Sequence, residues 1–213
     1  MENESNNKER AKVIIEILKK EYPKAKTKLV FKNPFQLLIA TILSAQCTDE
    51  RVNMVTKELF KKYKKPKDFA VAEISDLEKY IYSTGFYSSK AKNIKACSKS
   101  IIEKFKGAVP DNMEELTQLE GVGRKTANVV LGVVFGKPAI PVDTHVKRLS
   151  NLLQLSNESN PDKIEFELSN IIDKKKWLLY SDLIMAHGRK ICIAKKPKCG
   201  LCKISEYCPS KYN

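Results

Sequence analysis

The sequence predicts an all-α protein. Apolar residues recur every three to four positions along most of the chain, which is the spacing of one face of an amphipathic helix. No segment shows the alternation of apolar and polar residues that is typical of a half-buried strand. With 213 residues, of which 42% are apolar and 30% charged, the chain is long enough to bury a core as one domain or two lobes.

The helical pattern begins close to the N-terminus. The apolar face of the first predicted helix consists of Val13, Ile14, Ile17 and Leu18. Asn33-Pro34 opens the second helix, because proline is well tolerated in the first turn. The same periodicity predicts that this second helix covers residues 35–43 and that others lie around residues 52–60, 74–81, 91–105, 149–153, 164–172 and 177–185.

Two features between these helices concern the middle of the chain. Val129–Phe135 is apolar on nearly all sides, and its β-branched residues would also fit a buried strand. We favour a buried helix, because the neighbouring segments are helical, Ala127 precedes the run and no partner strand is available. Further upstream, Asp111 and Glu114 have the spacing of a capping box before Leu116.

The charge balance points to a polyanionic partner. Lysine and arginine outnumber aspartate and glutamate by 39 to 25, a formal net charge of +14. A phosphate backbone would attract this excess, although a plain lysine-rich surface would give the same count. No stretch reaches the roughly 18 to 20 apolar residues of a membrane span, and the polar N-terminus has no hydrophobic signal region. We therefore expect no membrane partner and a location inside the cell, in the cytoplasm or nucleoid of a prokaryote.

A glycine-containing turn at residues 119–127 (Leu-Glu-Gly-Val-Gly-Arg-Lys-Thr-Ala) joins two predicted helices. Gly121 and Gly123 allow a sharp turn and a close approach of the backbone to a ligand. Because the turn leads into a helix N-terminus, its N–H groups can bind an anion, and the charge balance favours a DNA phosphate. The alternative is an ordinary turn between helices with glycine at a C-cap.

Four cysteines lie within 17 residues near the C-terminus, at Cys192, Cys199, Cys202 and Cys208. Structural zinc sites usually contain two close pairs of Cys or His ligands, whereas only Cys199 and Cys202 are closely paired here. Four thiolates in one short loop therefore favour a bulkier [4Fe–4S] cluster over zinc or disulfide bonds.

Together with residues 142–146 (Val-Asp-Thr-His-Val), the glycine turn and the cysteine loop resemble the endonuclease III family of the helix–hairpin–helix, Gly/Pro-Asp (HhH-GPD) superfamily. The likeness runs from about residue 10 to residue 210 and includes residues 43–46 (Leu-Ser-Ala-Gln) and 85–91 (Gly-Phe-Tyr-Ser-Ser-Lys-Ala). The sequence departs from the family at Glu120, where the hairpin usually has proline. A carboxylate at this position weakly opposes the binding of a phosphate.

The resemblance implies two helical lobes with a DNA-binding cleft between them. One would be a six-helix lobe over residues 27–138 that contains the helix–hairpin–helix motif. The other would combine residues 1–26 with residues 139–213 and would hold the cluster in the loop 192–208. Lys125 and Asp143 would then face each other across the cleft.

The resemblance also implies a bifunctional DNA glycosylase and AP lyase of base excision repair, acting on oxidised pyrimidines of the thymine glycol type. The family's nucleophile falls on Lys125, whose amine would attack the sugar C1′ and displace the damaged base. The resulting Schiff base allows β-elimination of the 3′ phosphate. The family's aspartate falls on Asp143, which would stabilise positive charge on the sugar. From position alone, a phosphate contact is the favoured interpretation of Lys125, and either Asp143 or Thr144 could cap the next helix.

The same resemblance places further residues at the DNA, because a base must leave the stack before it can react. Gln46 would fill the gap left by the flipped nucleotide, and Phe86 would act as an apolar wedge, with a core aromatic as the alternative. His145 and His187 are expected to be structural hydrogen-bond partners. The remaining expected DNA contacts are Gly121, Val122, Gly123 and Arg124 in the turn and the basic residues Lys90, Arg189, Lys195 and Lys196, each of which has a solvated charge as its alternative.

The expected partner is double-stranded DNA that contains damaged bases or abasic sites, bound by a monomer. Two alternatives remain open. An adenine- or mismatch-specific glycosylase of the same superfamily would share the cluster and Asp143 but would generally lack a lysine at position 125. A non-catalytic DNA-binding protein would use the turn and the cluster only for docking.

Overall fold

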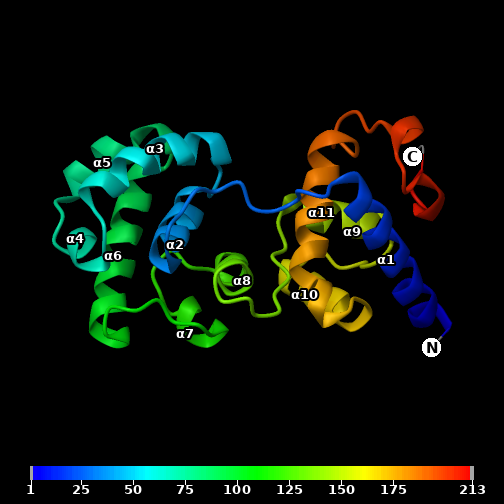
Figure 1. Ribbon diagram of the computed structural model, residues 1–213, viewed down its shortest axis with the longest axis horizontal. Helices are drawn as coiled ribbons and strands as arrows, with labels where there is room; N and C mark the ends of the chain where they lie inside the picture. The colour runs from blue at the N-terminus through cyan, green and yellow to red at the C-terminus, as the bar shows by residue number, and fades with distance from the viewer. Residues whose placement is uncertain (1, 212–213) are drawn as a thin grey trace. The chain divides into compact units, whose positions relative to one another are not determined.

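The computed structural model describes residues 2–211, with side chains from residue 6 onward. All regular secondary structure in this range is helical, which confirms the all-α prediction (Figure 1). None of the described helices is long and apolar enough to span a bilayer.

The chain divides into two compact units. One unit is Lys28–Lys137, which contains the glycine turn and is called the hairpin unit below. The other combines the described parts of Met1–Thr27 and Pro138–Asn213, contains the cysteine loop and is called the cysteine unit.

The hairpin unit is organised around α2 (Pro34–Leu43), which is buried at every position from Phe35 to Leu43. The helix begins at Pro34 as expected, and Asn33 caps it, because Oδ1 of Asn33 accepts a hydrogen bond of 2.9 Å from the N–H of Gln36. α2 packs against α3, α6 and α8, so the glycine turn rests on a helix with no solvated face. The other helical segments of this unit are α3 (Asp49–Lys62), α4 (Pro66–Ala70), α5 (Ile74–Ile81), the 3₁₀ turn η1 (Tyr82–Thr84), α6 (Tyr87–Phe105), α7 (Met113–Thr117) and α8 (Arg124–Val133).

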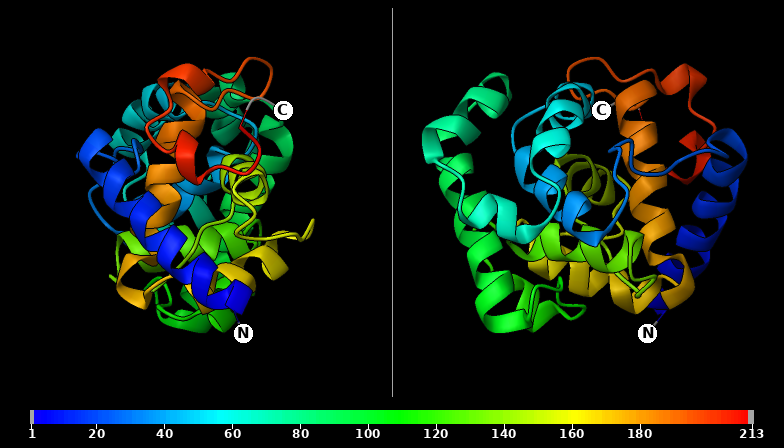
Figure 2. Two further views of the ribbon diagram at one scale, coloured as in Figure 1. Left: turned by 90° about the vertical axis from the view of Figure 1, so that its right-hand side faces the viewer. Right: turned by 60° about the vertical axis from the view of Figure 1, so that its left-hand side comes forward.

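The cysteine unit joins two distant parts of the sequence. α1 (Glu2–Glu21) packs against α10 and α11, and Figure 2 shows it beside α11 from two further directions. In the core, the hydroxyl groups of the fully buried Tyr180 on α11 and of Ser150 on α9 are hydrogen-bonded at 2.8 Å. The remaining helical segments of this unit are α9 (Thr144–Leu152), α10 (Pro161–Ile171), η2 (Lys174–Lys176), α11 (Trp177–Lys190), η3 (Cys199–Leu201) and η4 (Ser205–Tyr207).

Two local predictions need correction. The periodicity missed α4, because five residues hold too few apolar positions to show a period, and with it residues 28–137 form seven α-helices rather than six. The cap upstream of Leu116 begins at Asn112 rather than Asp111. Oδ1 of Asn112 accepts a hydrogen bond of 2.9 Å from the N–H of Glu115, and Nδ2 of Asn112 donates one of 2.6 Å to the Glu115 carboxylate.

The helical interpretation of residues 129–135 is confirmed as far as Val133, where α8 ends. Ala127, Val130 and Leu131 are buried on this helix, which packs against α2 and α7. The β-branched residues therefore serve a buried helix, because tertiary packing outweighs their intrinsic preference for strands.

Candidate active site and metal centre

The hairpin between α7 and α8 depends on glycine at position 121. Gly121 has φ +77°, a left-handed conformation that residues with a side chain rarely adopt. A Cβ atom here would lie 2.9 Å from Cβ of Asn93 on α6, too close for any side chain. Val122 is buried and donates its N–H to the carbonyl of Leu119 at 3.1 Å. The turn is thereby fixed against α6, and only its outer residues remain accessible.

The N-terminus of α8 is open to a ligand. Gly123 is the N-cap, in extended conformation, and no side chain caps the helix. The first N–H groups of a helix have no partner within the helix. Gly123, Arg124 and Lys125 are all exposed around them. Backbone donors, the positive end of the helix dipole and two cationic side chains together form a site for a phosphate.

Glu120, the residue that departs from the family pattern, has a hydrogen-bond partner on α6. Both carboxylate oxygens accept a hydrogen bond from Oγ of Ser100 on α6, at 3.2 and 2.9 Å. The carboxylate thus has a defined partner within the hairpin unit. The replacement of proline by Glu120 adds an attachment of the turn to α6.

Asp143, rather than Thr144, is the N-cap of α9. Its Oδ1 accepts a hydrogen bond of 2.7 Å from the N–H of Val146, and the carboxylate is half-buried at the positive end of the helix. The neighbouring His145 packs on α11, where a Cβ at Gly188 would lie 2.7 Å from Nδ1 of the ring. Burial lowers the pKa of His145, and the charge of Asp143 opposes this shift. The cap therefore fixes where the carboxylate points.

Gln46 and Phe86 lie in two turns of the hairpin unit, and both have a left-handed backbone, with φ +53° and +47°. The side chain of Phe86 is 66% exposed, so its alternative interpretation as a core aromatic is wrong. Gln46 is exposed as well. On either side of Phe86, the rings of Tyr82 and Tyr87 pack with their centroids 4.8 Å apart. An apolar ring held in solvent at a strained position suits an inserted wedge.

The prediction that Lys90 contacts a phosphate needs correction. Lys90 is only 5% exposed, and its ammonium donates hydrogen bonds to the carbonyls of Leu43, at 2.8 Å, and Thr84, at 2.9 Å. Burial lowers its pKa, and the nearby Cys47 opposes this shift. The sequence could not reveal this, because Leu43 is 47 positions away and a lysine in a polar stretch resembles a surface residue.

Arg189, Lys195 and Lys196 are exposed on the cysteine unit. Arg189 is in the last turn of α11, and the two lysines lie in the segment between α11 and η3. All three side chains can therefore be reached from solvent.

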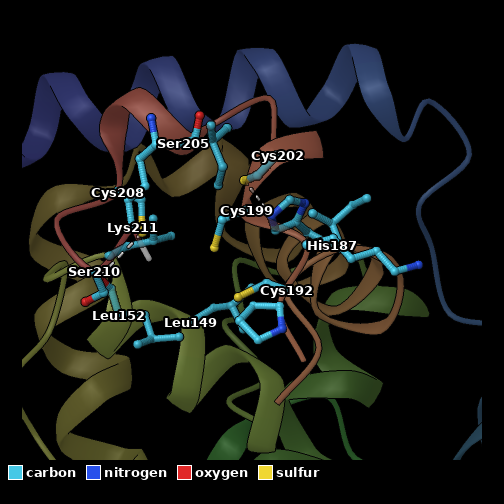
Figure 3. A pocket seen from close by; sticks show the side chains of 15 residues that line it. Leu149, Leu152, His187, Cys192, Cys199, Cys202, Ser205, Cys208, Ser210 and Lys211 are labelled. Carbon is cyan, nitrogen blue, oxygen red and sulfur yellow. Dashed lines mark hydrogen bonds between the residues drawn. The ribbon is translucent and has the colours of Figure 1, made fainter. Parts of the chain in front are cut away.

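The four cysteines of the C-terminal loop line one cavity of about 60 Å³ (Figure 3). α9 contributes leucines to its wall, and α11 contributes His187. Cys192 follows α11, Cys199 begins η3, and Cys202 and Cys208 directly follow the two 3₁₀ turns. All six cysteines of the chain are free, which argues against the disulfide alternative.

This cavity fits a cluster better than a single ion. Among residues 2–211, no three His, Cys, Asp or Glu side chains lie close enough to bind one metal ion, yet all four sulfurs line the same space. Burial raises the pKa of the thiols of Cys202 and Cys208, and the other thiols of the loop raise each of them further. A cationic iron–sulfur core would supply the charge that keeps four adjacent thiolates ionised.

A chain of hydrogen bonds connects Tyr22, the residue directly after α1, with the cysteine loop. The Tyr22 hydroxyl lies 3.0 Å from Nδ1 of the buried His187, whose Nε2 lies 3.4 Å from Sγ of Cys202. Burial lowers the pKa of His187 to about 4 and raises that of Tyr22 to about 12. A neutral imidazole can therefore accept a hydrogen bond from the Tyr22 hydroxyl at Nδ1 and donate one from Nε2 to sulfur. His187 was expected to be a structural hydrogen-bond partner, and the group it contacts is the sulfur of Cys202 in the cluster loop.

Arg148 on α9 is a contributor that the sequence did not reveal. Its Nη1 lies 3.6 Å from Sγ of Cys192, and its Nη2 donates to the carbonyl of the same residue. The guanidinium therefore ties α9 to the first cysteine of the loop. The contact spans 44 positions, so nothing in the local sequence indicates it.

The fold and these two sites define a helix–hairpin–helix protein with an iron–sulfur loop, and comparisons with known proteins agree. A family model for "HhH-GPD superfamily base excision DNA repair protein" matches residues 39–174, and one for "Iron-sulfur binding domain of endonuclease III" matches residues 192–208. Endonuclease III of Synechocystis sp. is 50% identical over 207 residues, which cover 97% of this chain and 94% of that protein.

Two solved structures are similar over 96% of this chain and 96% of theirs, each at 42% sequence identity. One is a non-covalent endonuclease III–DNA complex, with a TM-score of 0.91. The other is a trapped endonuclease III–DNA covalent intermediate, with a TM-score of 0.92. The chain belongs to the endonuclease III family of HhH-GPD base excision repair proteins. It is a bifunctional DNA glycosylase and AP lyase, and its cofactor is a [4Fe–4S] cluster.

Replacing Cys199 by alanine is expected to abolish the visible absorption of the cluster and to lower the iron content well below four per chain, because one of the four ligands is lost. Cys47→Ala is the matched control, since Cys47 lies in the hairpin unit, and it should keep both. Iron analysis and a visible spectrum of the purified proteins measure this. A colourless wild-type protein that contains zinc would contradict the assignment of the four cysteines.

Proposed function

We propose that Lys125 is the nucleophile of both reactions and that the substrate is duplex DNA containing an oxidised pyrimidine of the thymine glycol type. The observation that carries this proposal is an exposed lysine in the first turn of a helix that no side chain caps. A phosphate bound by the turn would bring a deoxyribose next to the Lys125 amine. The alternative role of Lys125 as a phosphate contact alone would leave the lyase activity without a nucleophile.

The proposed reaction has two stages, displacement of the base and elimination of the 3′ phosphate. The neutral amine of Lys125 attacks C1′, the glycosidic bond from C1′ to the base breaks, and the base leaves with the bonding electron pair. The attached nitrogen loses a proton, the C1′–O4′ bond breaks as O4′ takes up a proton, and a protonated Schiff base forms between Nζ and C1′. Loss of a C2′ proton then breaks the C3′–O bond, and the 3′ phosphate departs. Water hydrolyses the Schiff base and returns the free amine.

Asp143 is proposed to stabilise the positive charge that develops on the sugar as the base leaves. The hydrogen bond from Val146 supports this role, because it fixes the direction of the carboxylate. Lys125 belongs to the hairpin unit and Asp143 to the cysteine unit. The proposal therefore requires both units to act on the same nucleotide.

The proposed DNA contacts divide into two groups. Gln46 and Phe86 enter the base stack, where they offset part of the few kcal/mol that flipping a nucleotide costs. Phosphates are bound by Gly121, Gly123 and Arg124 in the turn and by Arg189, Lys195 and Lys196 on the cysteine unit. The expected contact at Val122 needs correction, because this residue is buried and its N–H bonds to Leu119. Because one chain supplies every proposed catalytic residue, we propose that it acts as a monomer, in the compartment that holds the genomic DNA.

The test is to incubate the wild-type protein with a duplex that carries a single thymine glycol. The expected result is release of the free base together with a nick. The nick leaves an unsaturated aldehyde at the 3′ end of the upstream fragment. A matched duplex with adenine opposite guanine should remain intact. Cleavage of the mismatch alone would favour the adenine-specific alternative, and binding without any product would favour the non-catalytic one.

A further inference from the structure

We propose that Lys90 is a positioning residue for nucleotide flipping, whose buried ammonium fixes the two turns that carry Gln46 and Phe86. This inference rests on the proposed function, in which these two residues enter the DNA stack. Lys90 does not touch the DNA itself. It acts by holding two separate turns of the hairpin unit in one arrangement.

Two hydrogen bonds of the Lys90 ammonium support this role, next to the backbone bond that position 90 makes in the first turn of α6. The ammonium donates to the carbonyl of Leu43 at 2.8 Å and to the carbonyl of Thr84 at 2.9 Å, and the backbone N–H donates to the carbonyl of Phe86 at 3.0 Å. Two of the bonds enclose Gly85 and Phe86 from both sides. The third ties this turn to the end of α2, three residues before Gln46. One side chain therefore links both proposed wedges.

The carbonyls that Lys90 binds are suited to a cation. Leu43 is the last residue of α2, so its carbonyl is among the four that a helix leaves without a partner inside it. The negative end of the helix dipole lies at the same place. Thr84 is the last residue of η1. The N–H of Gly85 donates to the carbonyl of Tyr82, not to that of Thr84. The ammonium thus joins two helical ends whose carbonyls point to one site.

The backbone of both turns needs such support. Gln46, Gly85 and Phe86 have φ values of +53°, +68° and +47°. Only glycine adopts this region without strain, so the two residues with side chains stay there only when neighbouring contacts determine their conformation. The backbone hydrogen bond from Gly85 to Tyr82 and the one from the Thr84 hydroxyl to Gly85 are both long, at 3.4 Å. The shorter bond from the Lys90 ammonium to the Thr84 carbonyl, at 2.9 Å, adds support at this turn.

A purely structural role explains these observations less well. Burying an ammonium is unfavourable, and both partners of Lys90 are neutral carbonyls rather than a carboxylate. An apolar side chain of similar length would fill the same volume without this penalty. What the ammonium adds is direction, since its three protons can bind several carbonyls at once.

The test compares Lys90→Met with Lys99→Met, a matched control that loses an exposed lysine of the same helix. Single-turnover base excision is measured on two DNA substrates, a duplex with thymine glycol and the same lesion in an unpaired bubble. We expect Lys90→Met to be slower on the duplex by about tenfold or more, and on the bubble by less than about threefold, because an unpaired base needs little help to flip. Lys99→Met should match the wild type on both.

A fluorescent 2-aminopurine placed next to the lesion reports insertion directly, and its signal at saturating Lys90→Met should fall short of the wild-type change. An equal loss on both substrates, or no loss on the duplex, would overturn the proposal. Lys90→Gln, which keeps two N–H donors, is read by the same criteria if the methionine variant does not fold. A wild-type protein that is inactive on both substrates would instead overturn the proposed function.

Discussion

The Lys125→Ala variant is expected to form no covalent adduct when it is incubated with a thymine glycol duplex and borohydride. Borohydride reduces a Schiff base to a stable amine, so the adduct requires the Nζ atom that this substitution removes. The rate of strand cleavage should fall by a factor of about 10³ or more, because no other exposed residue of the turn carries a primary amine. The measurement is a denaturing gel that separates free DNA, nicked DNA and cross-linked protein.

Two controls separate chemistry from binding. Lys125→Arg keeps a positive charge at the hairpin but has no amine that can form a Schiff base, so it should bind the duplex and leave it uncleaved. Lys99→Met removes an exposed charge elsewhere in the hairpin unit and should give the full adduct. An adduct of wild-type intensity in Lys125→Ala would show that another amine is the nucleophile.

The Asp143→Asn variant is expected to slow base excision by a factor of about 10² to 10³, because it removes a negative charge that stabilises the developing cation. Asparagine caps a helix as well as aspartate does, so the hydrogen bond to Val146 and the stability of α9 should be retained. Single-turnover excision together with urea unfolding measures the two effects on the same sample.

Asp143→Ala gives the complementary result. It removes the charge and the cap, so it should be as slow as Asp143→Asn and in addition lose about 1 kcal/mol of unfolding free energy. The pair of variants thereby distinguishes the two roles that the sequence left open for this carboxylate. Full activity in Asp143→Asn would leave Asp143 with the capping role alone.

Features encoded by neighbouring residues could be predicted well from the sequence. The glycine turn between two helices and the start of α2 at Pro34 both depend on backbone geometry within a few positions. The two candidates for the cap of α9 were also identified, and the structure selected Asp143 by one hydrogen bond. The cap near Leu116 was misplaced by one residue. Asp111 and Asn112 are adjacent, and either side chain can serve as a cap.

The functions of individual polar side chains were predicted less well, and Lys90 is the clearest example. A lysine followed by alternating polar residues looks like a surface cation, but the packing of α2 and α6 places its ammonium between two helical ends. Phe86 is the opposite case. Aromatic residues are usually buried, but the side chain of Phe86 is exposed to solvent. Burial is decided by how helices pack, which the sequence of one helix does not contain.

By itself, the sequence determined the all-α class, the glycine turn between two helices and the four-cysteine loop, because each depends on residues that are close together in the chain. Only the tertiary structure decided that Lys90 links two turns and that the Tyr22–His187 pair and Arg148 reach the cysteine sulfurs. These contacts join positions up to 165 residues apart. Their formation depends on the burial of apolar helix faces throughout each unit, which brings distant polar groups together and leaves them no water as a partner.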